Sequence, residues 1–543
     1  MPDSTEYVFG ANILDNLTTG MYTDSRVIFR EYIQNACDSI DIAEKTELLK
    51  QGQGIVDIYT NDSQRSITIR DNGTGISASD FRKILGRIAS SDKMLGESKG
   101  FRGIGRLCGL AYCETVVFST KACGEDTVSF MKCNAKLMRE LIQTNQSQKD
   151  LKLTAAEVLE QIVSYEVQKT NNVSEHWFEV KLINVNEENH DLLAKESVID
   201  YLSFISPVPY NKNFSYRSRI YEYIKTHKYK LSEYVIKVNG EQIFKDYRTH
   251  VKTSKGEDHI FDVQFHELYD ENGEVIAWMW YGLRGFQAVI ENDCLQRSLR
   301  LRKENIQIGD EDALRHLFKE QRGTHYFIGE VHAISKDLIP NSQRDYFNET
   351  PMRNTFEREA KMYFTDTLYP LYHAGNGISS AVAKIDSYNK QLREFEEKKN
   401  NGDFIDKRQQ KQAASSVEKA KNVAVEAQKS ITKLLDKHKG NSDSPIYKVV
   451  TRIAGDRDSN TVSSIDNDDN KDEVNNTSIN ENQGDENSQT GKKNKKTEYW
   501  TDRLHSASKS QRDLIRKVIN IVNDYVDDET MDKILKKIEE KFK

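Results

Sequence analysis

The sequence predicts a multidomain, mixed α/β protein that ends in helical segments. A chain of 543 residues is too long for one hydrophobic core, so three or four domains are expected. Runs with strand-like alternation are interleaved with helical runs up to about residue 368, and helical spacing dominates afterwards. The boundaries that we expect are 1–192 and 193–368 for two α/β domains, 369–440 for a helical coiled-coil hairpin, 441–497 for a disordered polar linker and 498–543 for a C-terminal helical segment.

The composition favours a soluble protein. Apolar residues make up 37% and charged residues 30% of the chain, and the formal net charge of −7 gives no global reason to expect nucleic-acid binding, although it leaves room for a local basic patch. The six cysteines show no C-x-x-C pair and no zinc spacing, which predicts reduced thiols. Without a basic-then-apolar leader or a run of about 18 apolar residues, we expect a cytoplasmic protein with no membrane span.

The first domain begins with a predicted helix over 27–49, whose apolar positions include Ile28, Tyr32, Ile33 and Ile40. Alternating and β-branched residues predict strands around this helix. These predicted strands are 55–60, 66–70, 115–119 and 178–182.

The second domain is also predicted to be rich in strands. The run 234–244 has the pattern of a β-hairpin with Asn239-Gly240 at its turn, and further strands are expected at 275–281 and 326–331. The basic run 297–303 has the pattern of an exposed alternating strand, and we assign it no catalytic role.

The C-terminal third is predicted to be helical on both sides of a polar linker. Apolar residues recur at steps of three and four over 385–395 and again over 417–434, with a break at 400–403, so an antiparallel hairpin is favoured over one long rod. Residues 441–497 have too few apolar side chains to offset their ordering entropy. Amphipathic spacing returns over 508–543.

Three short motifs in the first fifth of the chain carry the functional information. Glu31, Asn35 and Asp38 are spaced i, i+4 and i+7, so they project from one face of the predicted helix. Taken alone, this pattern is more typical of a solvated helix face.

The second motif shifts the balance toward a binding site, because Asp71 ends a predicted strand and is followed by Gly73 and Gly75. A carboxylate there can accept the exocyclic amine of adenine, and glycines allow close approach of the backbone.

The third motif is the glycine-rich segment 86–109, interleaved with serine, lysine and arginine. Such a segment can fold over phosphates, and backbone N–H groups near Gly103 and Gly105 would form an anion site. It is not a Walker A loop, since no G-x-x-x-x-G-K-[ST] occurs in the chain.

In this order, the motifs resemble those of the GHKL superfamily of ATPases, which includes gyrase, heat shock protein 90, histidine kinases and MutL. The resemblance implies a Bergerat-fold α/β sandwich, ATP and Mg²⁺ as ligands, Glu31 as the base that orients water, Asn35 as the magnesium ligand and Asp71 as the adenine reader. By the same resemblance, the nucleotide-binding residues are Asn35, Asp38, Asp71, Gly73, Gly75, Lys93, Lys99, Gly100, Arg102, Gly103, Ile104 and Gly105.

Two further segments bear on the resemblance to the GHKL superfamily. The segment 337–345 is similar to a middle-domain loop of heat shock protein 90 chaperones, which implies a second, transducer domain and makes Arg344 the residue that reaches the γ-phosphate, with Gln343 nearby. The superfamily usually has an adenine-binding threonine in a late strand, but the corresponding region 175–180 has none. Either this region does not correspond to that strand, or the base pocket is built differently from that of the relatives.

Three functions are considered for a chain with these motifs. An ATP-dependent clamp of the heat shock protein 90 type, which dimerises on closure, hydrolyses ATP slowly and holds or remodels a partner, fits best. A sensor histidine kinase is disfavoured, because the pocket begins near residue 26 and leaves no room for an upstream phosphoacceptor helix. A DNA-associated ATPase of the MORC or MutL kind, in genome defence or repair, stays open as the alternative.

Overall fold

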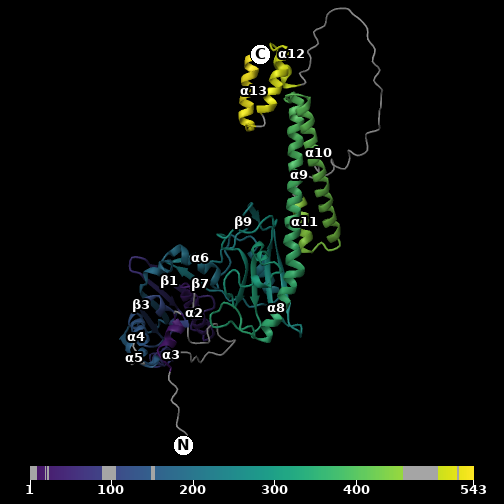
Figure 1. The fold of residues 1–543 in the computed structure, drawn as a ribbon. Helices are drawn as coiled ribbons and strands as arrows, with labels where there is room; N and C mark the ends of the chain where they lie inside the picture. The colour runs from purple at the N-terminus through teal and green to yellow at the C-terminus, as the bar shows by residue number, and fades with distance from the viewer. Residues whose placement is uncertain are drawn as a thin grey trace, which may run out of the picture. The chain divides into compact units, whose positions relative to one another are not determined.

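The computed structural model describes residues 9–18, 20, 24–87, 105–147, 153–455, 499–522 and 525–542 (Figure 1). The chain divides into two compact units, which are described separately. The first unit comprises residues 1–284 and 288–372, and the second comprises residues 285–287 and 373–543. No helix in the described ranges combines the length and apolar character needed to cross a bilayer.

A large sheet forms the base of the first unit, with strand order β5-β4-β3-β6-β2-β1-β7-β8. Every neighbouring pair is antiparallel except β1 and β7, which are parallel. The strands are β1 (Ile55–Asn61), β2 (Ser66–Asp71), β3 (Cys113–Lys121), β4 (Thr127–Asn134), β5 (Val163–Lys169), β6 (Trp177–Val185), β7 (Val235–Val238) and β8 (Glu241–Gln242). The four strands predicted in the first domain are therefore confirmed.

Helix α2 (Val27–Lys45) packs its apolar positions into the core of this sheet. Ile28, Ile33, Cys37 and Ile40 are all fully or almost fully buried, and burying such a side chain contributes about 1.5–3 kcal/mol. The other helices of the first unit are α1 (Asn12–Thr18), α3 (Ala78–Gly86), α4 (Ala135–Ser147), α5 (Ala155–Ile162), α6 (Lys195–Ile205), α7 (Arg217–Thr226) and α8 (Pro351–Tyr363).

The hairpin predicted over 234–244 forms, but its place in the molecule differs from the prediction. Its first strand, β7, pairs in parallel with β1, so the hairpin extends the first sheet instead of belonging to the second domain. Asn239 and Gly240 both adopt positive φ, at 49° and 83°, as the Asn-Gly turn requires. The Asn239 side chain also accepts a hydrogen bond from Thr60 N at 2.9 Å, which fixes the turn to β1.

A second sheet of the first unit has the order β11-β12-β15-β13-β14. Its strands are β11 (Asp262–Tyr269), β12 (Val275–Leu283), β13 (Ser298–Lys303), β14 (Ile306–Gln307) and β15 (Ile328–Ala333), and the separate pair β9 (His250–Thr253) and β10 (Gly256–His259) lies outside it. Strand β13 is not exposed as its alternating sequence suggested. Arg300 is 7% exposed and Arg302 is fully buried, where its guanidinium pairs with Glu330 at 2.5 Å.

The second unit contains α9 (Tyr369–Asn401) from His373 onward and all of α10 (Lys407–His438), and these two long helices lie side by side in Figure 1. The helices break where the sequence predicts. Gly402 has a φ of 68°, and the Asp406 side chain caps α10 by accepting from Gln409 N at 2.8 Å.

Part of the predicted linker is helical. Helix α11 (Pro445–Gly455) buries Ile446, Val449 and Val450, so the prediction of a disordered segment over 441–497 is wrong for these residues. The rest of that segment, from 456 onward, lies outside the described residues. The tail forms two helices, α12 (Lys509–Val522) and α13 (Asp528–Phe542), and Trp500 N donates to Phe404 O at 2.8 Å beside the α9–α10 turn.

Candidate nucleotide-binding site

Helix α2 places the first motif within the fold. Glu31 and Asp38 are 8% and 4% exposed, and Asn35 is half-buried. Ionisable side chains are rarely buried to this extent unless they are paired or used in function. The interpretation of this motif as a purely solvated helix face is therefore excluded.

The Glu31 carboxylate lies between two guanidinium groups. Its Oε1 is 3.6 Å from Arg30 Nε and 3.7 Å from Arg344 Nε, and all three side chains are at most 12% exposed. Both distances exceed that of a hydrogen bond, and Glu31 Oε1 has no hydrogen-bond partner in the described part of the chain. The carboxylate is thus positioned by charge, with one buried oxygen able to bind a further donor.

The loop that carries Arg344 is held by its own backbone contacts. Arg344 has a φ of 55°, an uncommon conformation for a residue with a side chain. Its N–H donates to Asn341 O at 3.2 Å, and its carbonyl accepts from Gly309 N at 2.8 Å. The Arg30 guanidinium also donates to Gln343 O at 3.0 Å. These contacts bring the predicted arginine of the second domain to the carboxylate of the first.

The second motif lies at the end of β2, against α2. Asp71 is 5% exposed, and its Oδ1 accepts from Gly73 N at 2.9 Å. Ser39, on α2, accepts from Thr74 N at 3.0 Å. A Cβ at Gly73 would lie 2.1 Å from Ser39 Oγ, so only glycine fits there.

Gly75 is restricted in the same way. Its φ is 65°, and a Cβ at this residue would lie 2.0 Å from Lys121 O. The glycines of the second motif are therefore required by the close packing of this loop on α2 and β3.

Strand β6, which pairs with β2 beside Asp71, contains no threonine. Opposite Asp71, strand β6 presents Phe178. The nearest threonine of the next strand is Thr120, which accepts from Ile76 N at 2.9 Å and donates to Trp177 O at 2.9 Å. Its hydroxyl thus supports the loop after Asp71.

Only the last residue of the predicted lid motif is described. A Cβ at Gly105 would lie 2.3 Å from Glu31 Oε2, so this glycine packs directly on the carboxylate. Residues Lys93, Lys99, Gly100, Arg102, Gly103 and Ile104 lie outside the described residues, and their assignment stays a prediction.

Arg106 follows the lid motif and hydrogen-bonds to residues at the end of α3, which precede that motif in the sequence. Its guanidinium donates to Ile84 O at 2.8 Å and to Arg87 O. On the other side, the Tyr32 hydroxyl donates to Arg106 O and accepts from Gly109 N, each at 3.1 Å. Burial lowers the pKa of Arg106 and raises the pKa of Tyr32 well above its usual value.

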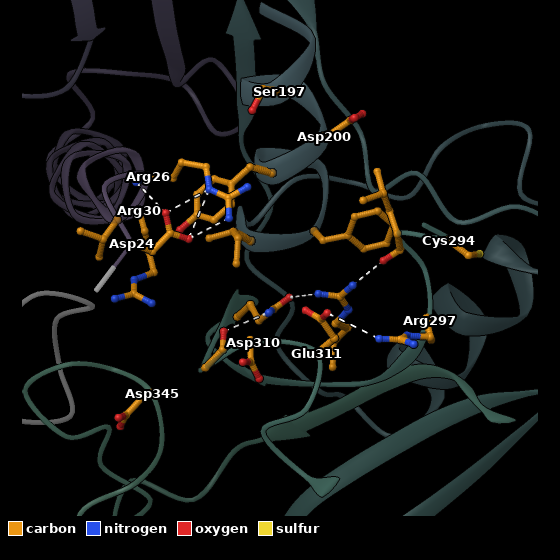
Figure 2. A pocket seen from close by; sticks show the side chains of 18 of the residues that line it. Asp24, Arg26, Arg30, Ser197, Asp200, Cys294, Arg297, Asp310, Glu311 and Asp345 are labelled. Carbon is orange, nitrogen blue, oxygen red and sulfur yellow. Dashed lines mark hydrogen bonds and ion pairs between the residues drawn. The ribbon is translucent and has the colours of Figure 1, made fainter. Parts of the chain in front are cut away.

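A cavity of about 750 Å³ adjoins the site through Arg30 and Gln343 (Figure 2). Figure 2 shows Asp24, Arg26 and Arg30 on one side and Arg297, Asp310 and Glu311 on another. Two ion pairs lie within the wall, with Arg26 2.9 Å from Asp24 and Arg297 3.9 Å from Glu311, and the lining holds residues of both charges. The balance of charge does not favour a particular ligand.

Sequence reasoning missed three residues of the site, namely Arg30, Ser39 and Arg106. Arg30 directly precedes Glu31, and on a helix neighbouring positions are not expected to share a face. Ser39 follows Asp38 but carries no charge, and Arg106 follows the glycine motif by one position. No spacing rule marks these residues, because each acts through a contact with a distant segment.

Comparison with known proteins agrees with this geometry. Residues 22–171 match the family model for the histidine kinase-, DNA gyrase B- and HSP90-like ATPases. This region is a GHKL-type ATPase domain. The match covers α2 with Glu31, the loop after β2 and Gly105, but not Arg344.

The chain is also similar, over part of its length, to bacterial proteins named chaperone protein HtpG. The identity is 27% over 132 residues with the protein of Helicobacter hepaticus, and 32% over 108 and 116 residues with those of Methylorubrum populi and Anaplasma marginale. The alignments cover 18–21% of this chain and 17–21% of each relative. The chain thus resembles the heat shock protein 90 type over about a fifth of its length.

Proposed function

We propose that this protein is an ATP-dependent clamp of the heat shock protein 90 type, which binds ATP with Mg²⁺, dimerises on closure and hydrolyses ATP slowly to hold or remodel a partner. The observation that carries the proposal is the Glu31–Arg344 contact of 3.7 Å between the GHKL domain and the second-domain loop. A catalytic site divided between two domains makes hydrolysis depend on how those domains dock.

The residues present fit ATP and magnesium. Glu31 Oε1 is a buried acceptor without a hydrogen-bond partner among the described atoms, and no hydrogen bond of the half-buried Asn35 side chain occurs there either. An amide oxygen such as that of Asn35 is a suitable ligand for Mg²⁺, which when bound would neutralise phosphate charge. Asp71 would accept from adenine, Asp38 would support the base pocket, and the glycine-rich segment up to Gly105 would approach the phosphates.

Glu31, Arg344 and Arg30 each have a distinct part in the proposed reaction. Glu31 accepts a proton from, or orients, the attacking water. Arg344 stabilises negative charge that develops on the transferred phosphoryl group. Arg30, which contacts both Glu31 and the Gln343 carbonyl, couples the position of the base to that of the second-domain loop.

ATP turnover by the full-length protein tests the enzyme assignment. We expect a wild-type rate well below the roughly 10 s⁻¹ typical of enzymes, and a loss of at least about 100-fold in Glu31→Ala and in Arg344→Ala. Binding of ATP should change by less than about 3-fold in both variants, since neither residue is assigned to hold the base or sugar.

The control is Arg358→Ala, which removes a half-exposed arginine from the same compact unit and should leave turnover unchanged. A wild-type protein that binds ATP but never hydrolyses it would contradict the enzyme assignment. Equal losses in Arg344→Ala and Arg358→Ala would contradict the role of Arg344.

A further inference from the structure

Helix α10 is strongly basic within an acidic protein. It carries eight lysines and arginines against three acids, a net charge of +5 with His438 neutral, whereas the whole chain has −7. Seven of the basic residues share the face opposite the buried residues Ala424, Ala427 and Ile431, and all seven are exposed. These residues, which we call the α10 basic face, are Lys407, Arg408, Lys411, Lys419, Lys429, Lys433 and Lys437.

The basic face differs from an ordinary solvated helix surface, in which lysines pair with glutamates one turn away. Within the described ranges, the only ion pair of a basic-face residue is Lys429–Glu426, at 3.1 Å. The tail packs on another side of α10, through Gln410 and Asp406, and the described residues of the second unit leave this face exposed.

The positive charges gather in two clusters. The first contains Lys407, Arg408 and Lys411, and the second contains Lys429, Lys433 and Lys437. Their centres are about 24 residues apart, which corresponds to about 36 Å along a helix that rises 1.5 Å per residue. One turn of B-form DNA spans about 34–36 Å, the distance after which the same face of the backbone returns. An open hollow of about 440 Å³ lies over the first cluster.

We propose that the α10 basic face binds the phosphate backbone of double-stranded DNA, with each lysine cluster contacting the backbone one helical turn from the other. The contact is independent of sequence, since it reads no base edges. This proposal goes beyond the ATP-dependent clamp and supplies a partner surface for it, but it rests on α10 alone and does not require ATP hydrolysis.

Duplex DNA is favoured over a membrane surface by the side chains between the lysines. Gln412, Ser415, Asn422 and Ser430 are exposed and polar, and Val423, 49% exposed, is the one large apolar side chain exposed on α10, whereas a membrane-bound helix inserts a continuous apolar face. The apolar face of α10 is already buried, as Ala424, Ala427 and Ile431 show.

The test is binding of fluorescently labelled duplexes of 8, 16 and 24 base pairs to the full-length protein without nucleotide. An 8-base-pair duplex spans about 27 Å and reaches only one cluster, whereas 16 base pairs span about 54 Å and reach both. We expect the 16-base-pair duplex to bind at least about 10-fold more tightly, with a slope of log K against log salt near −4 to −5, equivalent to about five phosphate contacts.

Two triple variants and a matched control complete the test. Lys407→Gln with Arg408→Gln and Lys411→Gln, or Lys429→Gln with Lys433→Gln and Lys437→Gln, should each reduce the magnitude of the salt slope by about 2.7 and abolish the preference for 16 over 8 base pairs. Glutamine has nearly the helix propensity of lysine, and circular dichroism should confirm retained helicity. The control removes three exposed lysines of α13, through Lys533→Gln, Lys536→Gln and Lys537→Gln, and should bind as wild type.

Three results would overturn the proposal. The first is equal affinity for 8 and 16 base pairs, and the second is an equal loss in the α13 control. The third is tighter binding to phosphatidylserine vesicles, or to a duplex RNA of 16 base pairs, than to the DNA. Failure of ATP turnover with intact DNA binding would reject the clamp and leave this inference standing.

Discussion

At the scale of single residues, the site is defined by what surrounds one carboxylate. Glu31 is approached by Arg30 on its own helix, by Arg344 from the second domain and by Gly105 at the end of the glycine-rich segment. Helix α2, Gly105 and the loop around Arg344 are far apart in sequence, and all three therefore meet at Glu31. A small displacement of this side chain should affect activity far more than stability.

Gly105→Ala tests that expectation. The added Cβ would lie 2.3 Å from Glu31 Oε2, and because this atom is the far end of a flexible side chain, the carboxylate can move aside while the backbone keeps its place. We expect ATP turnover to fall at least about 10-fold, since misplacement of a catalytic group by about 1 Å can cost about 100-fold. The thermal midpoint of the ATPase domain should fall by less than about 3 °C, which for a domain of about 150–250 residues corresponds to roughly 1 kcal/mol.

Gly10→Ala is the matched control, because a Cβ at Gly10 meets nothing within 4 Å. It should retain wild-type turnover. Full activity in Gly105→Ala would show that the Glu31 position seen here is not the one used in hydrolysis.

At the scale of elements, the sequence predicts the helices and strands whose pattern of apolar residues is complete within the element itself. The helix around Glu31, the strands β1, β2, β3 and β6 and the break between α9 and α10 all follow from periods of 3.6 or 2.0 residues. The parallel pairing of β7 with β1 joins residues about 180 positions apart, so no local pattern indicates it. Likewise, the burial of Arg302 depends on Glu330, which belongs to another strand.

Helix α11 shows a different limit of sequence reasoning. The segment 441–497 is polar on average, and that average concealed one short apolar run around Ile446, Val449 and Val450. The nucleotide site shows the same difference between residues that a local pattern predicts and residues that only long-range contacts reveal. Glu31, Asp71 and the glycines were recognised from motifs, whereas Arg30, Ser39 and Arg106 act through long-range contacts that no motif records.

Two glycines inside α9 give an element-scale prediction. At Gly377 an added Cβ meets nothing within 4 Å, whereas at Gly375 it would lie 2.9 Å from Phe286 Cβ and 3.1 Å from Gly285 O. Gly377→Ala should stabilise the helix by about 0.5–1 kcal/mol through its higher helix propensity. Gly375→Ala gains the same propensity but overpacks the contact with 285–286, so a net destabilisation of about 1–2 kcal/mol is expected.

Chemical unfolding followed by circular dichroism would measure both variants, and each serves as the control for the other because the chemical change is identical. The opposite signs are the expected result. Equal stabilisation by both would mean that residues 285–286 do not pack against α9 in solution.

At the scale of the whole molecule, the ATPase domain and the remaining chain have different degrees of similarity to known proteins. The similarity to the HtpG chaperones covers about a fifth of the chain, and the family model matches residues 22–171. The second sheet, the α9–α10 helices and the tail lie outside residues 22–171, which match the family model. The proposed coupling therefore has two parts, a nucleotide site within the residues that match the family model and an output region outside them.

The central prediction for the whole molecule is nucleotide-dependent dimerisation, which mass photometry can measure. Without nucleotide we expect a monomer of 62.6 kDa, and with Mg²⁺ and a non-hydrolysable ATP analogue a dimer of about twice that mass. The shift requires that the nucleotide bind the dimeric form more tightly, by about 10⁴-fold for a nearly complete change. Glu31→Ala should form the same dimer with ATP itself, because it binds but cannot hydrolyse.

Asp71→Asn should remain monomeric under every condition, because the carboxylate proposed to accept from adenine is lost. A wild-type monomer with and without the analogue would reject the clamp while leaving the ATPase assignment intact. A dimer that forms equally in Asp71→Asn and without nucleotide would show that association arises outside the nucleotide site, and the coupling between ATP and closure would then have to be sought in the arrangement of domains within a permanent dimer.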